Sequence, residues 1–181
     1  VNPDVCAWLT LDGTNIDYPV LQGETNLSYI NTDVYGNFAL AGSIFLDSRN
    51  SSTFADVFSL LYGHHMENSQ MFGDLDKYRS ADFLQQTNTG SLLVPGGRYA
   101  LRVFACIVVS ASDDLIYQPL QWQADNVPAM LDRLQADALC VDQAAMDDLR
   151  TAQDPKVLCM STCSSDYTDA RTVVLAAMQL E

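Results

Sequence analysis

The stretch Val157–Cys163, with the sequence VLCMSTC, is an apolar run that ends in a cysteine, and it predicts a β-strand. The polar residues 164–170 predict a loop, and the apolar residues 171–180 predict a second strand. Two strands joined in this way pair antiparallel, so that the end of one lies beside the start of the next. We therefore expect Cys163 at the tip of a strand, on the same face as Ser161, with Arg171 across the loop.

A guanidinium beside a thiol favours ionisation of that thiol, because positive charge stabilises the thiolate. The two histidines of the sequence follow the apolar run 57–62 and Gly63, about a hundred residues before the cysteine. Glycine lets the backbone turn, so His64 is expected at the mouth of a strand. Adjacent residues of a strand point to opposite faces, so His64 and His65 are expected to diverge.

Length and composition indicate one domain, residues 1–181, with a substantial core, since 48% of the residues are apolar. The net charge of -14 disfavours binding to nucleic acid or to an anionic lipid surface. An acidic, solvated surface explains this charge without a recognition patch. No apolar run approaches the roughly 20 residues that span a bilayer. Because the chain begins at Val1 without Met, we expect an upstream anchor or signal segment that is missing here.

The five cysteines give no regular spacing and an odd count, which argues against a disulfide framework; they are Cys6, Cys106, Cys140, Cys159 and Cys163. Cys159 and Cys163 are four residues apart in one strand, too far apart to bridge. Cys106, inside an apolar strand, is expected to be a small buried hydrophobic residue. No Cys-x-x-Cys is present and the two histidines diverge, so neither a metal site nor another cofactor is expected. The scattered acidic residues likewise give no calcium loop.

Short strands punctuated by turns dominate the rest of the chain. They are expected at residues 7–11, 15–21, 42–47, 91–94 and 98–110, with Pro19 marking an edge or bulge. Helices are expected at residues 69–78, 81–86, 122–139 and 144–150, with one or two helical turns at 25–31. The buried stripes of these helices comprise Met71, Leu75 and Tyr78, and then Val127, Met130, Leu131 and Leu134. The predicted fold is a closed, mostly β barrel with peripheral helices, one long helix being inserted before the strand that bears Cys163.

These motifs resemble the sortase family. Residues 158–163 with Arg171 resemble the Thr-Leu-x-Thr-Cys signature and downstream arginine of sortases, and residues 57–64 resemble the strand that leads into their Gly-His. Class B sortases in particular are similar at residues 2–8, 13–20, 25–26, 42–47, 49–50 and 71–72, and in the helix before the cysteine strand. The likeness covers nearly the whole chain. Cys159 and Met160 stand where the family usually has Thr-Leu, and the loop before Arg171 is short for class B.

The resemblance implies a cysteine transpeptidase of the thiol-protease type at the extracellular face of a Gram-positive cell. Such an enzyme cleaves a C-terminal sorting motif of a secreted protein after its Thr, through a thioacyl intermediate. It then passes the acyl group to an amine of the cell wall. By this resemblance Cys163 is the nucleophile, His64 the general acid and base, and Arg171 the group that stabilises the oxyanion.

The substrate groove is expected, by similarity, along Asn26, Ser161 and the Leu115-Ile116-Tyr117 segment. Ordinary packing in the barrel explains that three-residue segment equally well. The backbone N–H of Ser164 is a candidate second donor to the oxyanion. Asp166 invites a Cys-His-Asp triad, but its closeness to Cys163 in sequence gives no orientation toward an imidazole, and a loop-capping role is preferred.

Three other interpretations remain open. The amine acceptor could be a pilin subunit instead of a peptidoglycan precursor. The chain could instead be a cysteine peptidase that releases acyl groups to water, although the order His64 then Cys163 is the reverse of that in papain-like enzymes. It could also be a non-catalytic binding domain on the same fold, since a fold alone guarantees no activity. For Arg171 itself, the alternative role is a surface ion pair with Asp166 or Asp169, which would contribute little to stability.

Overall fold

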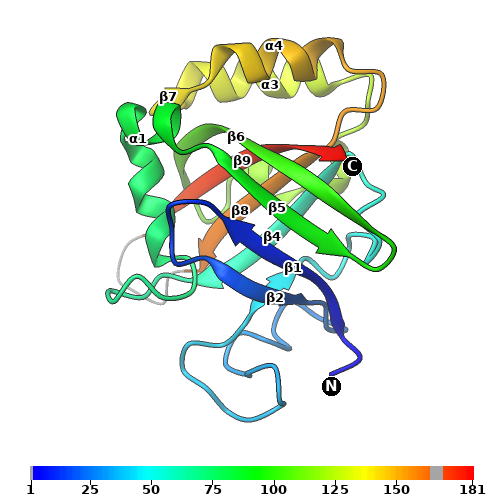
Figure 1. The fold of residues 1–181 in the computed structure, drawn as a ribbon, viewed down its shortest axis with the longest axis vertical. Coiled ribbons are helices and arrows are strands. Elements are labelled where there is room, and N and C mark those ends of the chain that lie inside the picture. The colour runs from blue at the N-terminus through cyan, green and yellow to red at the C-terminus, as the bar shows by residue number, and fades with distance from the viewer. Residues whose placement is uncertain (1, 164–168) are drawn as a thin grey trace.

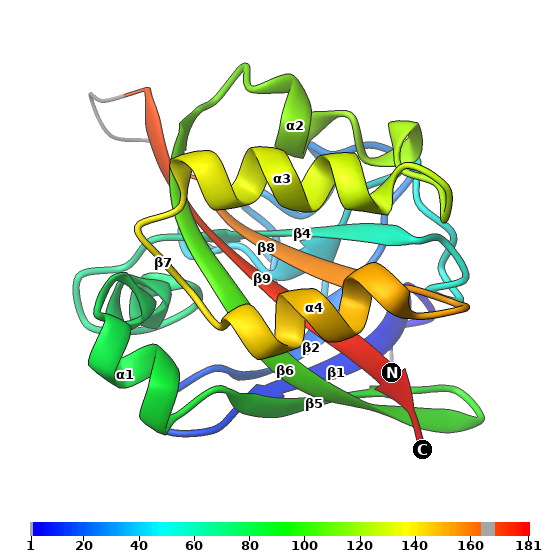
Figure 2. The ribbon, with the colours of Figure 1, turned by 90° about the horizontal axis from the view of Figure 1, so that it is seen from above.

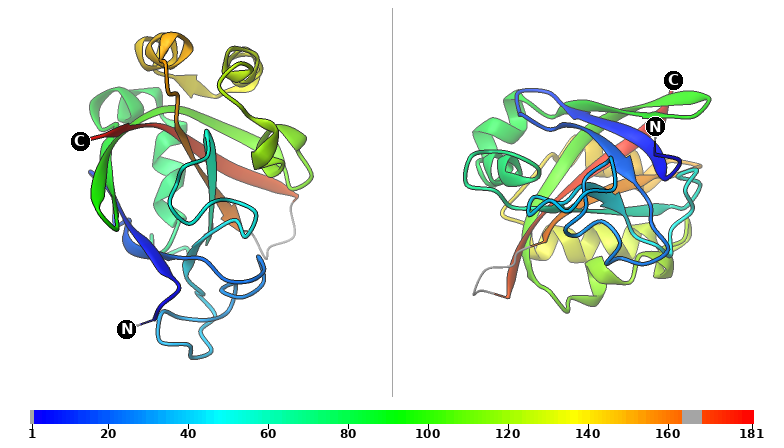
Figure 3. Two further views of the ribbon diagram at one scale, coloured as in Figure 1. Left: turned by 90° about the vertical axis from the view of Figure 1, so that its right-hand side faces the viewer. Right: turned by 90° about the horizontal axis from the view of Figure 1, so that it is seen from below.

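The computed structural model describes residues 2–163 and 169–181, and eight of the strands in this part close into a barrel (Figure 1). Neighbouring strands follow the order β5-β1-β2-β3-β4-β8-β9-β6, and β5 also pairs with β6, which closes the ring (Figure 3). The strands are β1 (Val5–Leu11), β2 (Asp17–Leu21), β3 (Ile44–Leu46), β4 (Phe58–His64), β5 (Thr89–Val94), β6 (Gly97–Ser110), β8 (Val157–Cys163) and β9 (Ala170–Leu180). The predicted closed barrel is confirmed.

Two of the pairings are parallel, and both involve strands near the predicted site. β2 pairs parallel with β3, and β4 pairs parallel with β8 over its full length. The hairpins β1–β2 and β5–β6 are antiparallel, as their turn residues predict. Pro19 pairs with Trp8 of β1, and the β2–β3 ladder begins only at Val20, so Pro19 lies on an edge segment as expected.

Strand alternation separates two cores, one inside the barrel and one outside it. Leu61, Met160 and Val174 belong to the interior cluster, whereas Leu60 and Cys159 belong to a second cluster on the outer face of β4, β6, β8 and β9. Each fully buried aliphatic side chain contributes about 1.5–3 kcal/mol. A slip of one residue would exchange the two faces of a strand, so burial on both sides fixes the register of these four strands.

Helices cover the outer core rather than entering the barrel. α3 (Val127–Asp137) and α4 (Gln143–Thr151) lie across β8, β9 and β6 (Figure 2), and the short α2 (Asp114–Tyr117) and η2 (Pro119–Gln121) lie beside them. The stripe of Val127, Met130, Leu131 and Leu134 is buried as predicted. No helix in the described part of the chain is both long and apolar enough to cross a membrane.

The predicted helix at 122–139 is wrong at both ends. α3 begins at Val127 with a proline in its first turn, and the Asn126 side chain accepts a hydrogen bond from Gln123 N (2.8 Å) instead of capping the helix. After Asp137 the chain turns to pair with β6 as the two-residue strand β7 (Cys140–Val141). The pairing with β6 therefore outweighs local helix propensity at the C-terminal end.

Two other predicted helices are also wrong in part. Residues 25–31 form successive turns without a helix. Residues 69–72 are not helical, because Ser69 and Met71 have positive φ angles of 60° and 52°. Helical structure begins only at η1 (Gly73–Arg79), a 3-10 helix followed by α1 (Ala81–Gln86). The expected burial of Met71, Leu75 and Tyr78 is nevertheless confirmed.

Gly63 has a different role from the turn that the sequence indicates. It lies inside β4, which continues through His64. A Cβ built at this position would come within 2.4 Å of Ile44 Cδ1 and 2.7 Å of Phe72 Cδ2. Glycine fits here because a core isoleucine and a core phenylalanine pack against its backbone.

Candidate active site

The parallel ladder between β4 and β8 brings His64 level with Cys163. Their Cα positions are direct partners in this ladder, although they are 99 positions apart in the chain. The same register pairs Tyr62 with Ser161, two residues earlier on both strands. Partners in a ladder lie on the same face of the sheet, so positions 64 and 163 share one face.

The neighbouring antiparallel ladder brings position 171 into the same row. β8 and β9 pair from Val157↔Ala177 to Ser161↔Val173. When the same register is continued by two residues on each strand, position 163 lies opposite Arg171. Hydrogen bonds between Thr162 and Thr172, which lie between these two rows, support the extension, since Thr172 N donates to Thr162 Oγ1 over 3.2 Å. His64, Cys163 and Arg171 thus occupy one row across β4, β8 and β9, which we call the His-Cys-Arg row.

This row lies on the outer face of the barrel, at the end of the outer core. Inward along β4, the same face bears Tyr62, Leu60 and Phe58, of which the last two are fully buried beneath the helices. Along β9 it bears Val173 and Leu175, also fully buried. The row is therefore the polar continuation of an apolar strip whose position is fixed by packing.

His64 is partly buried, and its ring contacts the loop between β2 and β3. Its Nε2 lies 2.6 Å from the backbone oxygen of Ile30. A carbonyl can only accept a hydrogen bond, so Nε2 is protonated and the neutral ring has its lone pair on Nδ1. The loop thereby fixes both the orientation and the tautomer of the imidazole.

His65 points away from the row, as strand alternation predicts. Its Nε2 lies 2.8 Å from Oδ2 of Asp76 in η1. Arg171 is partly exposed, and its Nη1 donates to the backbone oxygen of Ala170 over 3.2 Å. The histidine that shares the row with Cys163 and Arg171 is therefore His64.

A buried carboxylate, Asp47, organises the wall beside the row. Its side chain is 0% exposed and pairs with Arg49, whose Nη2 lies 2.8 Å from Oδ2. Asn26 Nδ2 and Tyr62 Oη also donate to Oδ2, over 3.0 and 2.9 Å. Burial opposes ionisation of Asp47, but the hydrogen bonds from Arg49 and Tyr62 outweigh it and hold the pKa of this carboxyl below its ordinary value.

Aromatic rings connect this wall to β8. Tyr62 stacks on Phe45, with ring centres 5.2 Å apart, and on Tyr117, with centres 6.3 Å apart. The Tyr117 hydroxyl is 2.7 Å from Ser161 Oγ. Burial, followed by the neighbouring Asp47 carboxylate, raises the pKa of Tyr62, so its hydroxyl remains a hydrogen-bond donor.

The predicted groove residues separate into two groups. Asn26, Tyr117 and Ser161 belong to the hydrogen-bonded wall just described. Leu115 and Ile116 are 2% and 0% exposed and pack in the outer core, which favours packing as their role. Ser164 and Asp166 lie outside the described residues. The Ser164 N–H as a second oxyanion donor and the loop-capping role of Asp166 therefore stay predictions.

The other four cysteines, Cys6, Cys106, Cys140 and Cys159, are buried free thiols. Burial raises the pKa of Cys6 to about 11 and that of Cys106 to about 12. Burial also raises the pKa of Cys140 and Cys159. None of these four thiols has the ionised character of a nucleophile.

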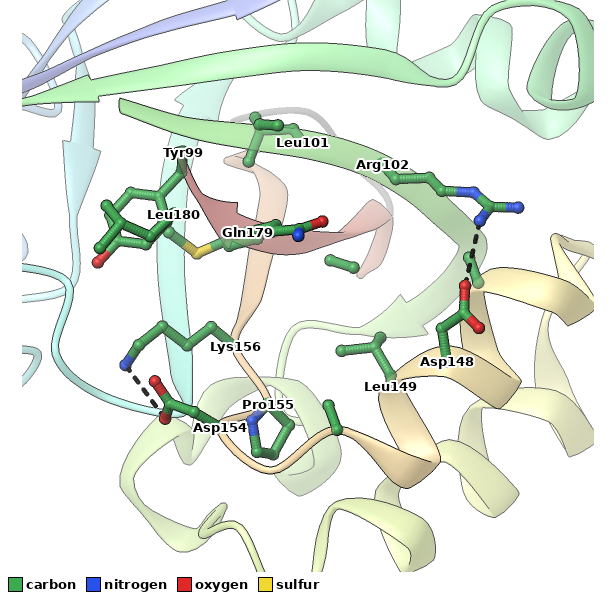
Figure 4. Close-up of a pocket in the computed structure, with 15 residues that line it drawn as sticks. Tyr99, Leu101, Arg102, Asp148, Leu149, Asp154, Pro155, Lys156, Gln179 and Leu180 are labelled. Atoms are coloured by element: carbon green, nitrogen blue, oxygen red, sulfur yellow. Dashed lines mark hydrogen bonds and ion pairs between the residues drawn. The ribbon is translucent and has the colours of Figure 1, made fainter. Parts of the chain in front are cut away.

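A cavity of about 530 Å³ lies away from the row, between α4 and the last residues of β9 (Figure 4). Leu101, Leu149 and Leu180 line it, and the charged groups at its rim are already paired, Arg102 with Asp148 and Lys156 with Asp154. Its β9 lining begins at Ala177, six residues along the strand from Arg171 or about 20 Å at 3.3 Å per residue. The cavity is separate from the His-Cys-Arg row.

The sequence interpretation missed three polar residues around the row. Alternation could have found Tyr62, which lies two residues before His64 on the same face. Asp47 also had a signal, since Arg49 follows it by two residues in the sequence. No signal in the sequence indicated Asp76, because one of its partners, Thr172, is 96 positions away.

Comparison with known proteins agrees with the barrel. The Sortase domain family model matches residues 9–179, and the chain belongs to the sortase family. Within it, the similar proteins are class B sortases. Sortase B of Staphylococcus aureus (strain NCTC 8325 / PS 47) is 30% identical over 97% of this chain and 70% of its own length. Sortase B of Listeria monocytogenes serovar 1/2a is 33% identical over 96% of this chain and 69% of its own length.

Solved structures give the same assignment. A Streptococcus pyogenes class B sortase involved in pilus biogenesis superposes with a TM-score of 0.87 at 36% identity, covering 98% of this chain and 93% of that one. A Staphylococcus aureus sortase B–substrate complex gives a TM-score of 0.87 at 29% identity, covering 99% and 81%. A sortase B complexed with triglycine gives a TM-score of 0.86 at 29% identity, covering 98% and 81%.

Proposed function

We propose that this protein is a cysteine transpeptidase that cleaves a C-terminal sorting motif and transfers the acyl group to an amine. The observation that supports this most directly is the pairing of His64 with Cys163 in the β4–β8 ladder, together with the β8–β9 register, whose continuation by two residues brings Arg171 into the same row. Sulfur, imidazole and guanidinium are the three groups that thioacyl transfer requires at one place: a nucleophile, a proton carrier and an anion stabiliser.

The first half-reaction forms a thioester. The Cys163 thiolate attacks the scissile carbonyl carbon, a C–S bond forms, and the carbon–nitrogen bond of the peptide breaks. The protonated His64 imidazole gives its proton to the leaving amine. With Nε2 engaged by the Ile30 carbonyl, the proton leaves from Nδ1 and the ring keeps its orientation.

The second half-reaction reverses these roles. The acceptor amine attacks the thioester carbon, His64 removes its proton, and the Cys163 thiolate leaves. Arg171 cannot act as a base, because its guanidinium stays protonated. It stabilises the oxyanion of both tetrahedral intermediates, a contribution of about 3 kcal/mol by analogy with other oxyanion donors.

The wall of Asn26, Tyr62, Tyr117 and Ser161 provides the groove for the sorting motif. Asn26 and Tyr62 donate to the buried Asp47, Tyr62 stacks on Tyr117, and the fully buried Ser161 holds the Tyr117 hydroxyl from behind, which makes a rigid, mixed polar and aromatic surface beside the row. Such preformed surfaces position a peptide with little loss of entropy. Leu115 and Ile116 act behind this wall as packing.

Membership of the sortase family supports the partners that we propose. The acyl donor is the sorting motif of a secreted protein, and the acceptor is an amine of a peptidoglycan precursor. The protein works at the extracellular face of the membrane of a Gram-positive cell, held there by an N-terminal anchor. A pilin amine is the alternative acceptor, since the similar Streptococcus pyogenes enzyme is involved in pilus biogenesis.

The test is to incubate the domain with a panel of fluorogenic sorting peptides, alone and with an amine. Triglycine represents the wall acceptor and a lysine-bearing pilin peptide represents the alternative. Mass spectrometry should find a new amide product only when an amine is present. Hydrolysis that no amine diverts would indicate a peptidase, and no turnover of any peptide by the wild type would indicate a binding domain.

Matched cysteine variants identify the nucleophile. Cys163→Ala should abolish turnover and the trapped acyl-enzyme, whereas Cys159→Ala, four residues back on the same strand and buried, should retain both. Arg171→Ala should also abolish turnover while circular dichroism shows an intact fold. A Cys163→Ala enzyme with the wild-type rate would contradict the assignment.

A further inference from the structure

Asp76 of η1 connects two strands of the site through a single carboxylate. Its Oδ2 lies 2.8 Å from Nε2 of His65, at the end of β4. Its Oδ1 accepts a hydrogen bond of 2.9 Å from the hydroxyl of Thr172, at the start of β9. One side chain therefore holds together two strand ends that are 107 positions apart in the sequence.

A third strand joins through Thr172. The backbone N–H of Thr172 donates to Thr162 Oγ1 over 3.2 Å, and this hydroxyl is 3.4 Å from Thr172 O. The described backbone ladder of β8 and β9 ends one row earlier, at Ser161↔Val173. Thr162 thus continues the attachment of β8 to β9 with its side chain at the point where that ladder stops. We call His65, Asp76, Thr162 and Thr172 the Asp76 bridge.

Every strand residue of the Asp76 bridge is the immediate neighbour of a residue of the His-Cys-Arg row. His65 follows His64, Thr162 precedes Cys163, and Thr172 follows Arg171. Successive strand residues point to opposite faces, so the bridge lies behind the row and fixes the backbone of β4, β8 and β9 at the same level.

The carboxylate is itself held on a fixed support. Leu75, one residue before Asp76 in η1, and Tyr78, two residues after it, are both fully buried in the barrel core. Arg79 also lies near it, with Nη1 4.0 Å from Oδ1, but at this distance and with 52% exposure it is too distant and solvated to compete. The side chains of His65 and Asp76 are themselves 38% and 40% exposed, so this pair adds little to global stability and its effect is local.

We infer that Asp76 is a positioning residue for the proposed transpeptidation, which holds the ends of β4, β8 and β9 in the alignment that brings His64, Cys163 and Arg171 together. This inference rests on the proposed function. A displacement of about 1 Å in a reacting group can lower the rate about 100-fold, so loss of the bridge should act on the chemical step more than on peptide binding.

The experiment compares Asp76→Ala, Asp76→Asn and Arg79→Ala in kcat and KM for the sorting peptide, in thermal midpoint, and in the rate of Cys163 alkylation by iodoacetamide. Asp76→Ala should lower kcat by about 10- to 100-fold with KM within about two-fold. Asp76→Asn should recover most of this loss, because its amide still accepts from Thr172 and donates to the other tautomer of His65. Arg79→Ala, on the same helix, should leave kcat unchanged.

The alkylation rate of Cys163 makes the test independent of the choice of peptide. It should change in Asp76→Ala and return in Asp76→Asn, because it depends on the local arrangement of thiol, imidazole and guanidinium. If Asp76→Ala behaves like Arg79→Ala in both readouts, the inference is overturned. If the wild type turns over no peptide while alkylation still follows the Asp76 series, the proposed function fails and the positional role of Asp76 stands.

Discussion

His64 and Cys163 are partners in the parallel ladder of β4 and β8, a ladder buried on both faces along most of its length. Its inner face packs in the barrel through Leu61 and Met160, and its outer face packs under the helices through Leu60 and Cys159. The level of the histidine relative to the cysteine is therefore set by core packing. A one-residue slip would exchange the side chains of the two cores, and each core would then have to repack around the wrong residues.

The two adjacent histidines give a matched pair of variants. His64→Ala should lower kcat by about 100- to 10,000-fold, because it removes the proposed proton carrier. His65→Ala should cost about 10-fold, since it removes one contact of the Asp76 bridge and no reacting group. Steady-state kinetics with the sorting peptide and triglycine measure both. Equal losses in the two variants would refute the assignment of His64.

Native thiol labelling should distinguish Cys163 from the other four cysteines. Burial raises the pKa of Cys6 to about 11 and of Cys106 to about 12, and Cys140 and Cys159 are also shifted upward. At about pH 7.5 these thiols are protonated and covered, so iodoacetamide should modify one cysteine per chain. Peptide mapping should find the label on residue 163. Labelling of all five should require a denaturant, and rapid modification of Cys106 in the folded protein would contradict this prediction.

Removal of Asp47 should weaken both the fold and the groove. Asp47→Ala leaves Asn26, Arg49 and Tyr62 without their common acceptor and should cost about 2–4 kcal/mol in urea unfolding. Asp47→Asn, which keeps one acceptor, should cost less. KM should rise in both, because Tyr62 and Tyr117 lose their support. Asp148→Ala is the control: Asp148 is 80% exposed, its ion pair with Arg102 spans 3.4 Å, and its loss should be below about 0.5 kcal/mol.

The sequence was sufficient for the barrel, and less so for the polar contacts around the His-Cys-Arg row. The strand Val157–Cys163 and the buried helix stripes follow from local periodicity. This pattern predicts them well because the apolar residues that form it are the ones that pack in the core. Residues 25–31 form turns in which the Ile30 carbonyl contacts His64, and residues 69–72 leave the helical region because Ser69 and Met71 adopt positive φ. Contacts of this kind join distant segments and leave no local pattern.

Alkaline pH should destabilise the protein through its buried thiols. The pKa of Cys6 and Cys106 is raised from 9.0 to about 11 and about 12, so between pH 9 and 11 the unfolded chain ionises these groups and the folded chain does not. Ionisation favours the unfolded state, and stability that is complete below pH 9 is lost as pH rises, by about 1.4 kcal/mol per pH unit for each fully ionised thiol. Urea midpoints at pH 8, 9 and 10 measure the slope, and Cys106→Ala should reduce it. A stability independent of pH in this range would count against the burial of both thiols.

Gly63 links the core to the proposed catalytic histidine, and Gly63→Ala should therefore affect stability and rate together. The added methyl would come within 2.4 Å of Ile44 Cδ1 and 2.7 Å of the Phe72 ring. Overpacking of this kind costs about 1–3 kcal/mol, and the backbone shift that relieves it would move His64, the next residue, out of its row. The activity of the sample should therefore fall by a larger factor than its folded fraction, because kcat of the folded molecules also decreases. Gly97→Ala is the matched control, since a Cβ there meets only Leu180 Cδ1, at 3.3 Å, and both stability and kcat should stay near the wild-type values. Gly63→Ala could instead lose stability while kcat of the folded fraction stays unchanged. In that case the two core side chains, and not β4, would move to make room for the methyl group, and the coupling between packing and catalysis would be disproved.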